Sequence, residues 1–252
     1  LEAARSRLGE ARSDATAAVP SIAVLPFTDM SPDKSQAYFA EGIAEELIHT
    51  LSHLQDLRVV ARTSAFALAG RNLTLREIGR ALDVRAILEG SVRQSGTRLR
   101  ITAQLTDVES GFHLWSERFD RDGGEIFAIQ DELSAAIVEH LKVSLRIGEQ
   151  AALRKRATVN PEAYAQYLKG LYLFARPRPD SLDTALRFYH QALDLDPTFA
   201  RAWAAIGYVY AMIANLNFEP PNEVWPRVKA AMAKALALDD QLPEGHALAA
   251  TV

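Results

Sequence analysis

The 252-residue sequence contains no cysteine, so it offers no disulfide, thiol nucleophile or thiolate metal site. It also lacks any run of about 18 uncharged apolar residues, the length that a membrane-spanning helix needs. Its first twenty residues lack the apolar core of a signal peptide. The missing cysteine does not decide the compartment; we expect the cytoplasm, with the periplasm as the alternative.

A strong basic charge is missing as well. Residues 1–150 carry 17 basic and 22 acidic side chains, and residues 151–252 carry 11 and 10. Neither part has the basic excess of a domain that binds nucleic acid through its phosphates, so we expect no direct nucleic-acid partner. The chain begins at Leu1, and residues 246–252 have the composition of a helix that has just started, so we expect a piece of a longer protein.

Motifs that carry catalysis are absent too. The sequence holds no G-x-x-x-x-G-K-[ST], G-x-G-x-x-G or G-x-S-x-G string, so it indicates no catalytic residues and no cofactor. His49 and His53 have the spacing of a zinc pair, but Thr50 stands where the zinc-protease motif has glutamate, so we expect a helix flank and no metal. Residues 120–124 resemble a calcium loop, but Glu125 replaces the sharp-turn glycine, which favours an ordinary turn.

Strand and helix patterns alternate after residues 1–20, which read as a linker ending in proline. Residues 21–27 form a short apolar run, typical of a strand buried on both faces. Apolar residues then recur every three or four positions over 40–54, which predicts an amphipathic helix. Leu57–Val60 is a second short strand, and Thr74 with Glu77 fits a capping box that starts another helix.

The clearest strand pattern covers residues 98–106, where apolar and polar side chains alternate. Turn sequences separate it from similar runs at 86–93 and 112–119, so we predict an antiparallel meander. A further helix follows over 126–145. Residues 21–150 therefore predict an α/β domain with a mixed sheet.

The second part of the sequence has an internal repeat. QALDLDP at 191–197 recurs as KALALDD at 234–240, an offset of 43 residues. Residues 203–210 match the tetratricopeptide pattern W-x2-L-G-x2-Y, with isoleucine in the leucine position. We predict two tetratricopeptide (TPR) repeats and the start of a third over 151–252, with proline-rich insertions that lengthen the turns at 176–181 and 215–226.

Stacked hairpins of this kind leave a concave groove lined by the first helix of each repeat. In the second repeat the predicted lining residues are Arg201, Ala204, Tyr208, Ala211 and Met212. Aromatic, cationic and soft apolar side chains together favour a protein or peptide partner. The alternative is that this face packs onto the α/β domain or onto further repeats.

Four segments resemble a bacterial family. SIAVLPF, YFAEGIAEELIHTL, VRAILEGSVRQSGTRLRITAQLTDVESGFHLWSERFD and IFAIQDEL are similar to the α/β domain related to the amino-terminal domain of the translocation protein TolB. In that family the domain is often followed by TPR repeats. The resemblance covers residues 21–252, and its most specific block is 84–120.

Such tandems follow a class III adenylate or guanylate cyclase, a winged-helix DNA-binding domain or a protein kinase. The resemblance thus implies a non-catalytic accessory, sensory or scaffolding module of a signalling protein. We favour a cyclase as the parent and a winged-helix regulator as the alternative. The oligomeric state is not indicated.

A contrasting hypothesis is an autonomous enzyme or small-molecule sensor whose ligand lies near the ends of segments 21–27 and 85–93. Separately, we predict that Arg93, Arg98 and Arg100 cluster on the exposed face of the meander, where they could meet phosphates or an acidic protein surface. No aromatic residues interleave with them, so a solvated sheet face is the simpler interpretation.

Overall fold

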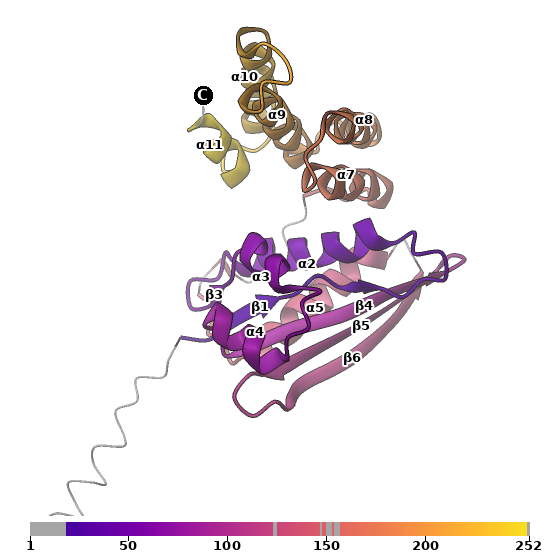
Figure 1. The fold of residues 1–252 in the computed structure, drawn as a ribbon, viewed down its shortest axis with the longest axis vertical. Coiled ribbons are helices and arrows are strands. Elements are labelled where there is room, and N and C mark those ends of the chain that lie inside the picture. Colours follow the sequence, from indigo (N-terminus) through magenta and orange to yellow (C-terminus); the bar gives the residue numbers. More distant parts are fainter. Residues whose placement is uncertain (1–18, 123–124, 147, 150–152, 154–156, 251–252) are drawn as a thin grey trace, which may run out of the picture.

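A computed structural model describes residues 19–122, 125–146, 148–149, 153 and 157–250. Nearly all of the predicted linker, residues 1–18, lies outside this range. The strands of the described chain all precede residue 123, and a group of helices follows from residue 161 (Figure 1). The order of elements is that of a mixed α/β layer followed by helical hairpins.

The sheet has six strands and mixed direction. β1 lies parallel to both β3 and β4, whereas β4, β5 and β6 form the predicted antiparallel meander, which is confirmed. Gly96 and Gly111 supply positive φ angles in its two turns. The strand order is β3-β1-β4-β5-β6, so β6 is an edge strand, and β2 pairs with β4 beside this path. The strands are β1 (Ser21–Val24), β2 (Thr28–Asp29), β3 (Arg58–Val59), β4 (Ala86–Ser95), β5 (Arg98–Asp107) and β6 (His113–Asp122).

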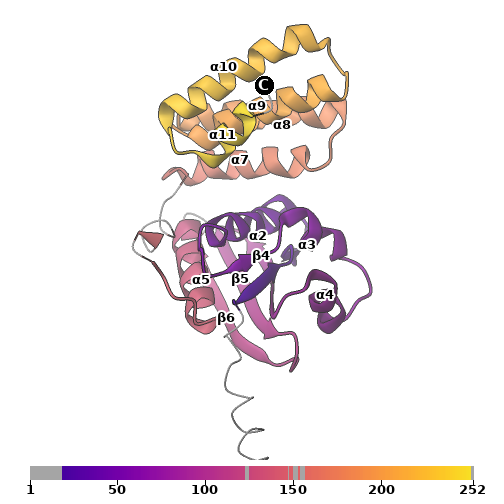
Figure 2. The ribbon, with the colours of Figure 1, turned by 90° about the vertical axis from the view of Figure 1, so that its left-hand side faces the viewer.

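Helices cover both faces of the sheet (Figure 2). The longer helices α2 (Ala37–Leu51) and α5 (Ile126–His140) pack on one face, and the short helices α3 (Arg62–Leu68) and α4 (Leu75–Leu82) pack on the other. The predicted capping box at the start of α4 is confirmed: the Thr74 amide donates to the Glu77 carboxylate at 2.8 Å, and the Glu77 amide donates to the Thr74 hydroxyl at 3.3 Å. The sequence patterns predicted neither α3 nor β2.

The remaining helices form two hairpins and a final short helix. The 43-residue repeat is visible in how the second helix of each hairpin ends. Asp196 and Asp239 both follow the last helical residue, with φ of −143° and −144°, and each side chain accepts the amide of the residue two positions on. The helices are α7 (Pro161–Phe174), α8 (Pro179–Leu195), α9 (Ala200–Asn215), α10 (Pro221–Leu238) and α11 (Pro243–Ala249).

The two proline-rich segments do not form the long turns that we predicted. Pro179 and Pro221 instead begin α8 and α10, and only residues 175–178 and 216–220 connect the helices. Proline suits the first helical position, because the amide that it lacks would have no helical acceptor there. Pro226 lies inside α10. Residues 221–226, which we predicted as part of a turn, are therefore helical.

The hairpins pack directly on the sheet layer through α2, which lies beneath α7 in both views (Figures 1 and 2). The helices come close at Gly42, where an added Cβ would lie 2.7 Å from Leu168 of α7. One continuous cluster of buried side chains runs from the strands through α2 into α7, α8, α9 and α10. The division into domains 21–150 and 151–252 stays a prediction, because the two parts share this core.

Among the described helices, none combines the length and the apolar character required to cross a membrane.

Candidate functional site: a groove between the sheet layer and the hairpins

A groove of about 710 Å³ lies where α2 meets the hairpins. One wall comes from α2 of the sheet layer, and the other comes from α7, α9 and the start of α11. Three of the predicted partner-binding residues border it, namely Arg201, Ala204 and Tyr208. The alternative that this face packs onto the α/β domain anticipated a contact with the first half of the chain, but not that α2 would form one wall of a groove.

Arg201 lies deep in this contact and is only 9% exposed. Its Nη1 donates to both carboxylate oxygens of Glu46 on α2, at 2.7 and 2.9 Å, and its Nε donates to Glu244 on α11 at 2.9 Å. The guanidinium also lies 5.5 Å from the centre of the Tyr167 ring. Arg201 therefore joins three helices and has two carboxylate partners already.

His49 lies beside this ion-paired group, with Nδ1 3.7 Å from the Glu244 carboxylate. Burial and the positive charge of Arg201 lower the pKa of His49 to about 4, although Glu46 and Glu244 act in the opposite direction. Burial and Arg201 outweigh the two carboxylates, because both carboxylates are already ion-paired with Arg201. His49 is therefore uncharged at neutral pH.

Two carboxylates border the groove, those of Glu45 and Glu244; Glu244 shares Arg201 with Glu46, and its Oε2 has no hydrogen-bond partner among the described residues. Glu45 pairs with a different cation. Its Oε2 lies 3.0 Å from Arg62 Nε, which is the cation that pairs with it. Arg62 is also shared with Glu41, at 3.6 Å. Burial, reinforced by Glu46 and opposed by Arg62, raises the pKa of Glu45. With 27% of its side chain exposed, Glu45 can be reached from the groove.

The groove is otherwise mainly apolar and aromatic. Leu171 and Phe174 near the end of α7 form one side, and Ile48 of α2 lies opposite. Tyr189 of α8 is fully buried behind them, and its ring fills the space left by Gly170, where an added Cβ would lie 2.4 Å away. The Tyr189 hydroxyl has no hydrogen-bond partner among the described residues. Such a surface can bind apolar side chains.

The other predicted groove residues lie elsewhere. Ala211 is buried in the shared core, and Met212 is half-buried against it; neither borders the groove. Tyr208 donates its hydroxyl to the Glu244 carbonyl oxygen at 3.1 Å. Sequence reasoning missed Glu45, Leu171 and Phe174. The carboxylates of α2 were visible as the run Glu45-Glu46, but nothing local connected them with α7 and α9.

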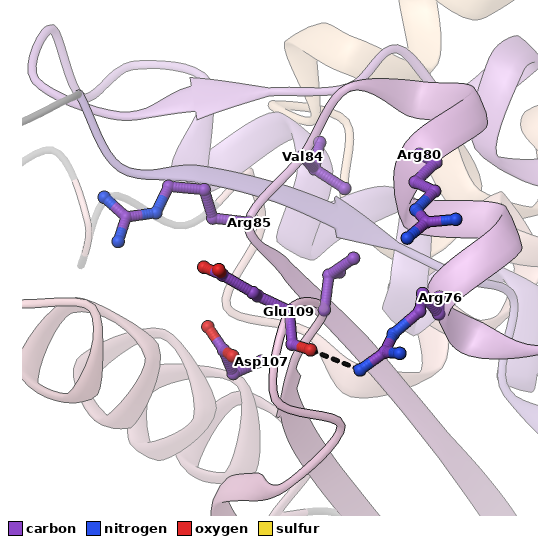
Figure 3. Close-up of a pocket in the computed structure, with 7 residues that line it drawn as sticks. Arg76, Arg80, Val84, Arg85, Asp107 and Glu109 are labelled. Atoms are coloured by element: carbon purple, nitrogen blue, oxygen red, sulfur yellow. Dashed lines mark hydrogen bonds between the residues drawn. The ribbon is translucent and has the colours of Figure 1, made fainter.

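A second, smaller depression of about 350 Å³ lies between α4 and the turn from β5 to β6. Arg76 and Arg80 of α4 lie on one side of it and Arg85 extends to the other, so the three guanidiniums do not converge (Figure 3). Arg76 donates to the Glu109 carbonyl oxygen. Arg85 begins one of the two segments near whose ends the small-molecule hypothesis placed its ligand, but the arrangement provides no focused anion site.

The exposed arginines of the meander also have acidic neighbours. Arg93 and Arg100 are cross-strand partners, and all three predicted arginines are exposed. Arg100 Nε donates to Asp120 of β6 at 2.6 Å, and Arg118 lies 3.3 Å from the same carboxylate. Asp120 therefore belongs to a strand and an ion-pair group; residues 123 and 124 of the rejected calcium loop lie outside the described range.

His49 and His53 stack edge to face, with ring centroids 4.8 Å apart. Within the described part of the chain, no cluster of three or more potential ligand side chains could hold a metal ion. The His53 Nδ1 lies 2.9 Å from the His49 carbonyl oxygen, a contact typical of a helix flank.

Comparison with known proteins adds one sequence relative. The chain is 40% identical over 231 residues to "Putative adenylate cyclase 3" of Rhizobium meliloti (strain 1021), a match that covers 91% of this chain and 39% of that protein. The chain thus spans about two fifths of the length of its relative. No protein-family model matches the chain.

Several solved structures are similar to part of the chain. They include TolB from Acinetobacter baumannii (18% identity, TM-score 0.36, covering 49% of this chain and 28% of that one). The lipoprotein GNA1162 from Neisseria meningitidis is 22% identical with a TM-score of 0.36, and the match covers 50% of this chain and 99% of that one. The LpoB C-terminal domain from Salmonella enterica is 16% identical with a TM-score of 0.34, and the match covers 46% of this chain and 91% of that one. TolB, the family that the sequence resembles, is among them, but identities and scores this low say nothing about activity.

Proposed function

We propose that this chain is a non-catalytic accessory part of an adenylate-cyclase-like signalling protein, and that its helical hairpins act as TPR repeats that bind a protein segment. The observation that carries the first half is the 40% identity to a protein named as an adenylate cyclase, of which the chain covers only 39%. That name favours a cyclase over a winged-helix regulator as the parent.

Three features support the second half of the proposal. The hairpins repeat with the same helix-ending geometry at Asp196 and Asp239. Gly170 and Gly207 occupy close contacts between helices, as small residues do in stacked hairpins. Finally, the groove exposes apolar and aromatic side chains beside charged ones, which suits a peptide segment. The predicted cytoplasmic location belongs to the same proposal.

The accessory role is tested by an assay for cyclic AMP formation from ATP with Mg²⁺ or Mn²⁺. We expect the 252-residue chain to form none, and the polypeptide encoded by its whole gene to form it. Turnover by the chain alone would refute the accessory role, and the same assay with GTP covers a guanylate cyclase.

Partner binding is tested with the groove variant Phe174→Ala, which shortens the apolar side at the end of α7. Arg201→Ala is unsuited to this test, because loss of the guanidinium would leave Glu46 and Glu244 without their cation. We expect Phe174→Ala to lose peptides selected by the unmodified chain. Asp183→Asn, on the exposed side of α8, serves as the control and is expected to retain them.

A further inference from the structure

The charges around the groove do not balance. Glu45 and Glu244 border it with Arg62 and Arg201, and the ion pairs of these residues extend to Glu41, Glu46 and Arg176. The connected group thus holds four carboxylates and three guanidiniums. Arg176 donates to Glu41 at 2.6 Å, and Arg201 is used by Glu46 and Glu244. Glu45 therefore shares only Arg62, and the group carries one negative charge more than its cations neutralise.

The position of Glu45 makes this excess charge available to a partner. It lies on α2 one turn before Ile48 and His49, all three of which border the groove. Its carboxylate is 27% exposed with Arg62 as its cation, and the same lining holds Glu244, whose Oε2 has no hydrogen-bond partner among the described residues. By contrast, Glu46 is 12% exposed and already accepts two hydrogen bonds from Arg201. A donor arriving in the groove would meet Glu45.

The same groove rejects an acidic partner. The Arg201 donors that could have received a carboxylate are directed at Glu46 and Glu244. Arg62 lies against Glu45 and over the Phe66 ring at 4.4 Å. An incoming carboxylate would lie beside Glu45 and Glu244, and both guanidiniums of the lining are already ion-paired with carboxylates of the chain, so like-charge repulsion would cost binding energy.

We propose that the groove binds a peptide segment that carries a Lys or Arg side chain beside apolar residues, with the cation against Glu45 and the apolar side chains against Leu171 and Phe174. This inference rests on the proposed function and specifies the chemistry of its partner. The aromatic rings of Tyr208 and Phe174 add a favourable surface for a cation, because ring faces attract positive charge. The site is composite, since α2 supplies the charge and the hairpins supply the apolar side.

The test is a selection from a library of random displayed heptapeptides on the immobilised 252-residue chain. Peptides that bind the unmodified chain but not Phe174→Ala are sequenced as groove-dependent. We expect them to be enriched in Lys or Arg flanked by apolar residues. A synthetic peptide of the enriched sequence is then titrated by fluorescence anisotropy against Glu45→Gln, Ser52→Lys and the control Asp183→Asn.

We expect Glu45→Gln to weaken binding about tenfold and Ser52→Lys, which adds a cation at the groove, to weaken it further. Asp183→Asn should leave binding unchanged, and 0.5 M salt should reduce the effect of Glu45. Groove-dependent peptides without a basic residue, or a basic peptide insensitive to Glu45→Gln, would overturn this inference and leave the proposed function standing. Absence of any groove-dependent peptide would overturn both. Urea unfolding of each variant checks that it is folded.

Discussion

The ion-paired group around Arg201 gives a quantitative test of how the hairpins are fixed to the sheet layer. Arg201→Met keeps the length and much of the volume of the side chain but removes its charge. The substitution leaves the Glu46 carboxylate, which is only 12% exposed in the unmodified chain, without its main partner. Removal of one partner from a buried ion pair costs about 3 to 5 kcal/mol. Because Glu244 is 26% exposed and regains water more easily, we expect about 3 kcal/mol.

The measurement is urea unfolding at pH 7, followed by far-ultraviolet circular dichroism and by tryptophan fluorescence. Arg227→Met is the matched control, because Arg227 pairs with Glu219 at 3.0 Å while both side chains are largely solvated. We expect that control to lose less than about 1 kcal/mol. The double variant Arg201→Met with Glu46→Gln removes the cation and the carboxylate that it would otherwise leave unpaired. Its loss of unfolding free energy should therefore be smaller, by roughly 1 to 2 kcal/mol, than the sum of the losses in the two single variants.

Two results would refute this account. A loss below about 1 kcal/mol for Arg201→Met would show that the two carboxylates are well solvated without their cation. Strict additivity in the double variant would show that Arg201 and Glu46 do not interact across the two layers.

Three further predictions concern other positions. Gly170→Ala should lower stability by about 1 to 3 kcal/mol in urea unfolding, although alanine favours helices, because its Cβ would strike the Tyr189 ring; a gain would show that the ring moves away. Because the pKa of His49 is lowered in the folded chain, the unfolded chain binds a proton first as the pH drops from about 6.5 towards 4, and the free energy of unfolding should fall over that range. The loss is at most about 3 kcal/mol, and the partial exposure of His49 makes it smaller. His49→Gln should flatten that part of the pH profile. Burial raises the pKa of Asp196, but hydrogen bonds from Thr158 and Thr198 outweigh burial and lower that pKa. The contribution of Asp196 to the free energy of unfolding is therefore present at neutral pH and is lost in acid below about 3.8. Asp196→Asn should destabilise the chain more at pH 7 than at pH 3, and an equal loss at both would contradict this.

Local patterns were sufficient to predict most of the sheet layer. The alternation along β5 and the capping box at Thr74 each depend on neighbours within a few residues, and both are present where we predicted them. The short helix α3 was missed because Ala61 before it makes no side-chain cap and seven residues show little periodicity. The prolines of α8 and α10 misled us because we treated them as helix breakers and not as first residues.

The candidate site could be predicted only in part for a different reason. Tyr208 and Ala204 were found because they share one face of a single helix. The partner of Arg201 lies 155 residues away on α2, and no local rule connects those positions. The hairpin face packs on the sheet layer at Arg201, which is ion-paired with Glu46 of α2. Beside that contact the face borders the groove at Ala204 and Tyr208.

The double burial of α2 bears on how the protein can be divided for laboratory work. One side of this helix contacts strands, and the side with Gly42 contacts Leu168. A fragment that stops at residue 150 would expose an apolar stripe to water and is expected to aggregate or to need detergent. A fragment that starts at residue 157 would lose the cover over Tyr167 and Leu168 in the same way. Expression trials should therefore keep α2 and α7 on one polypeptide.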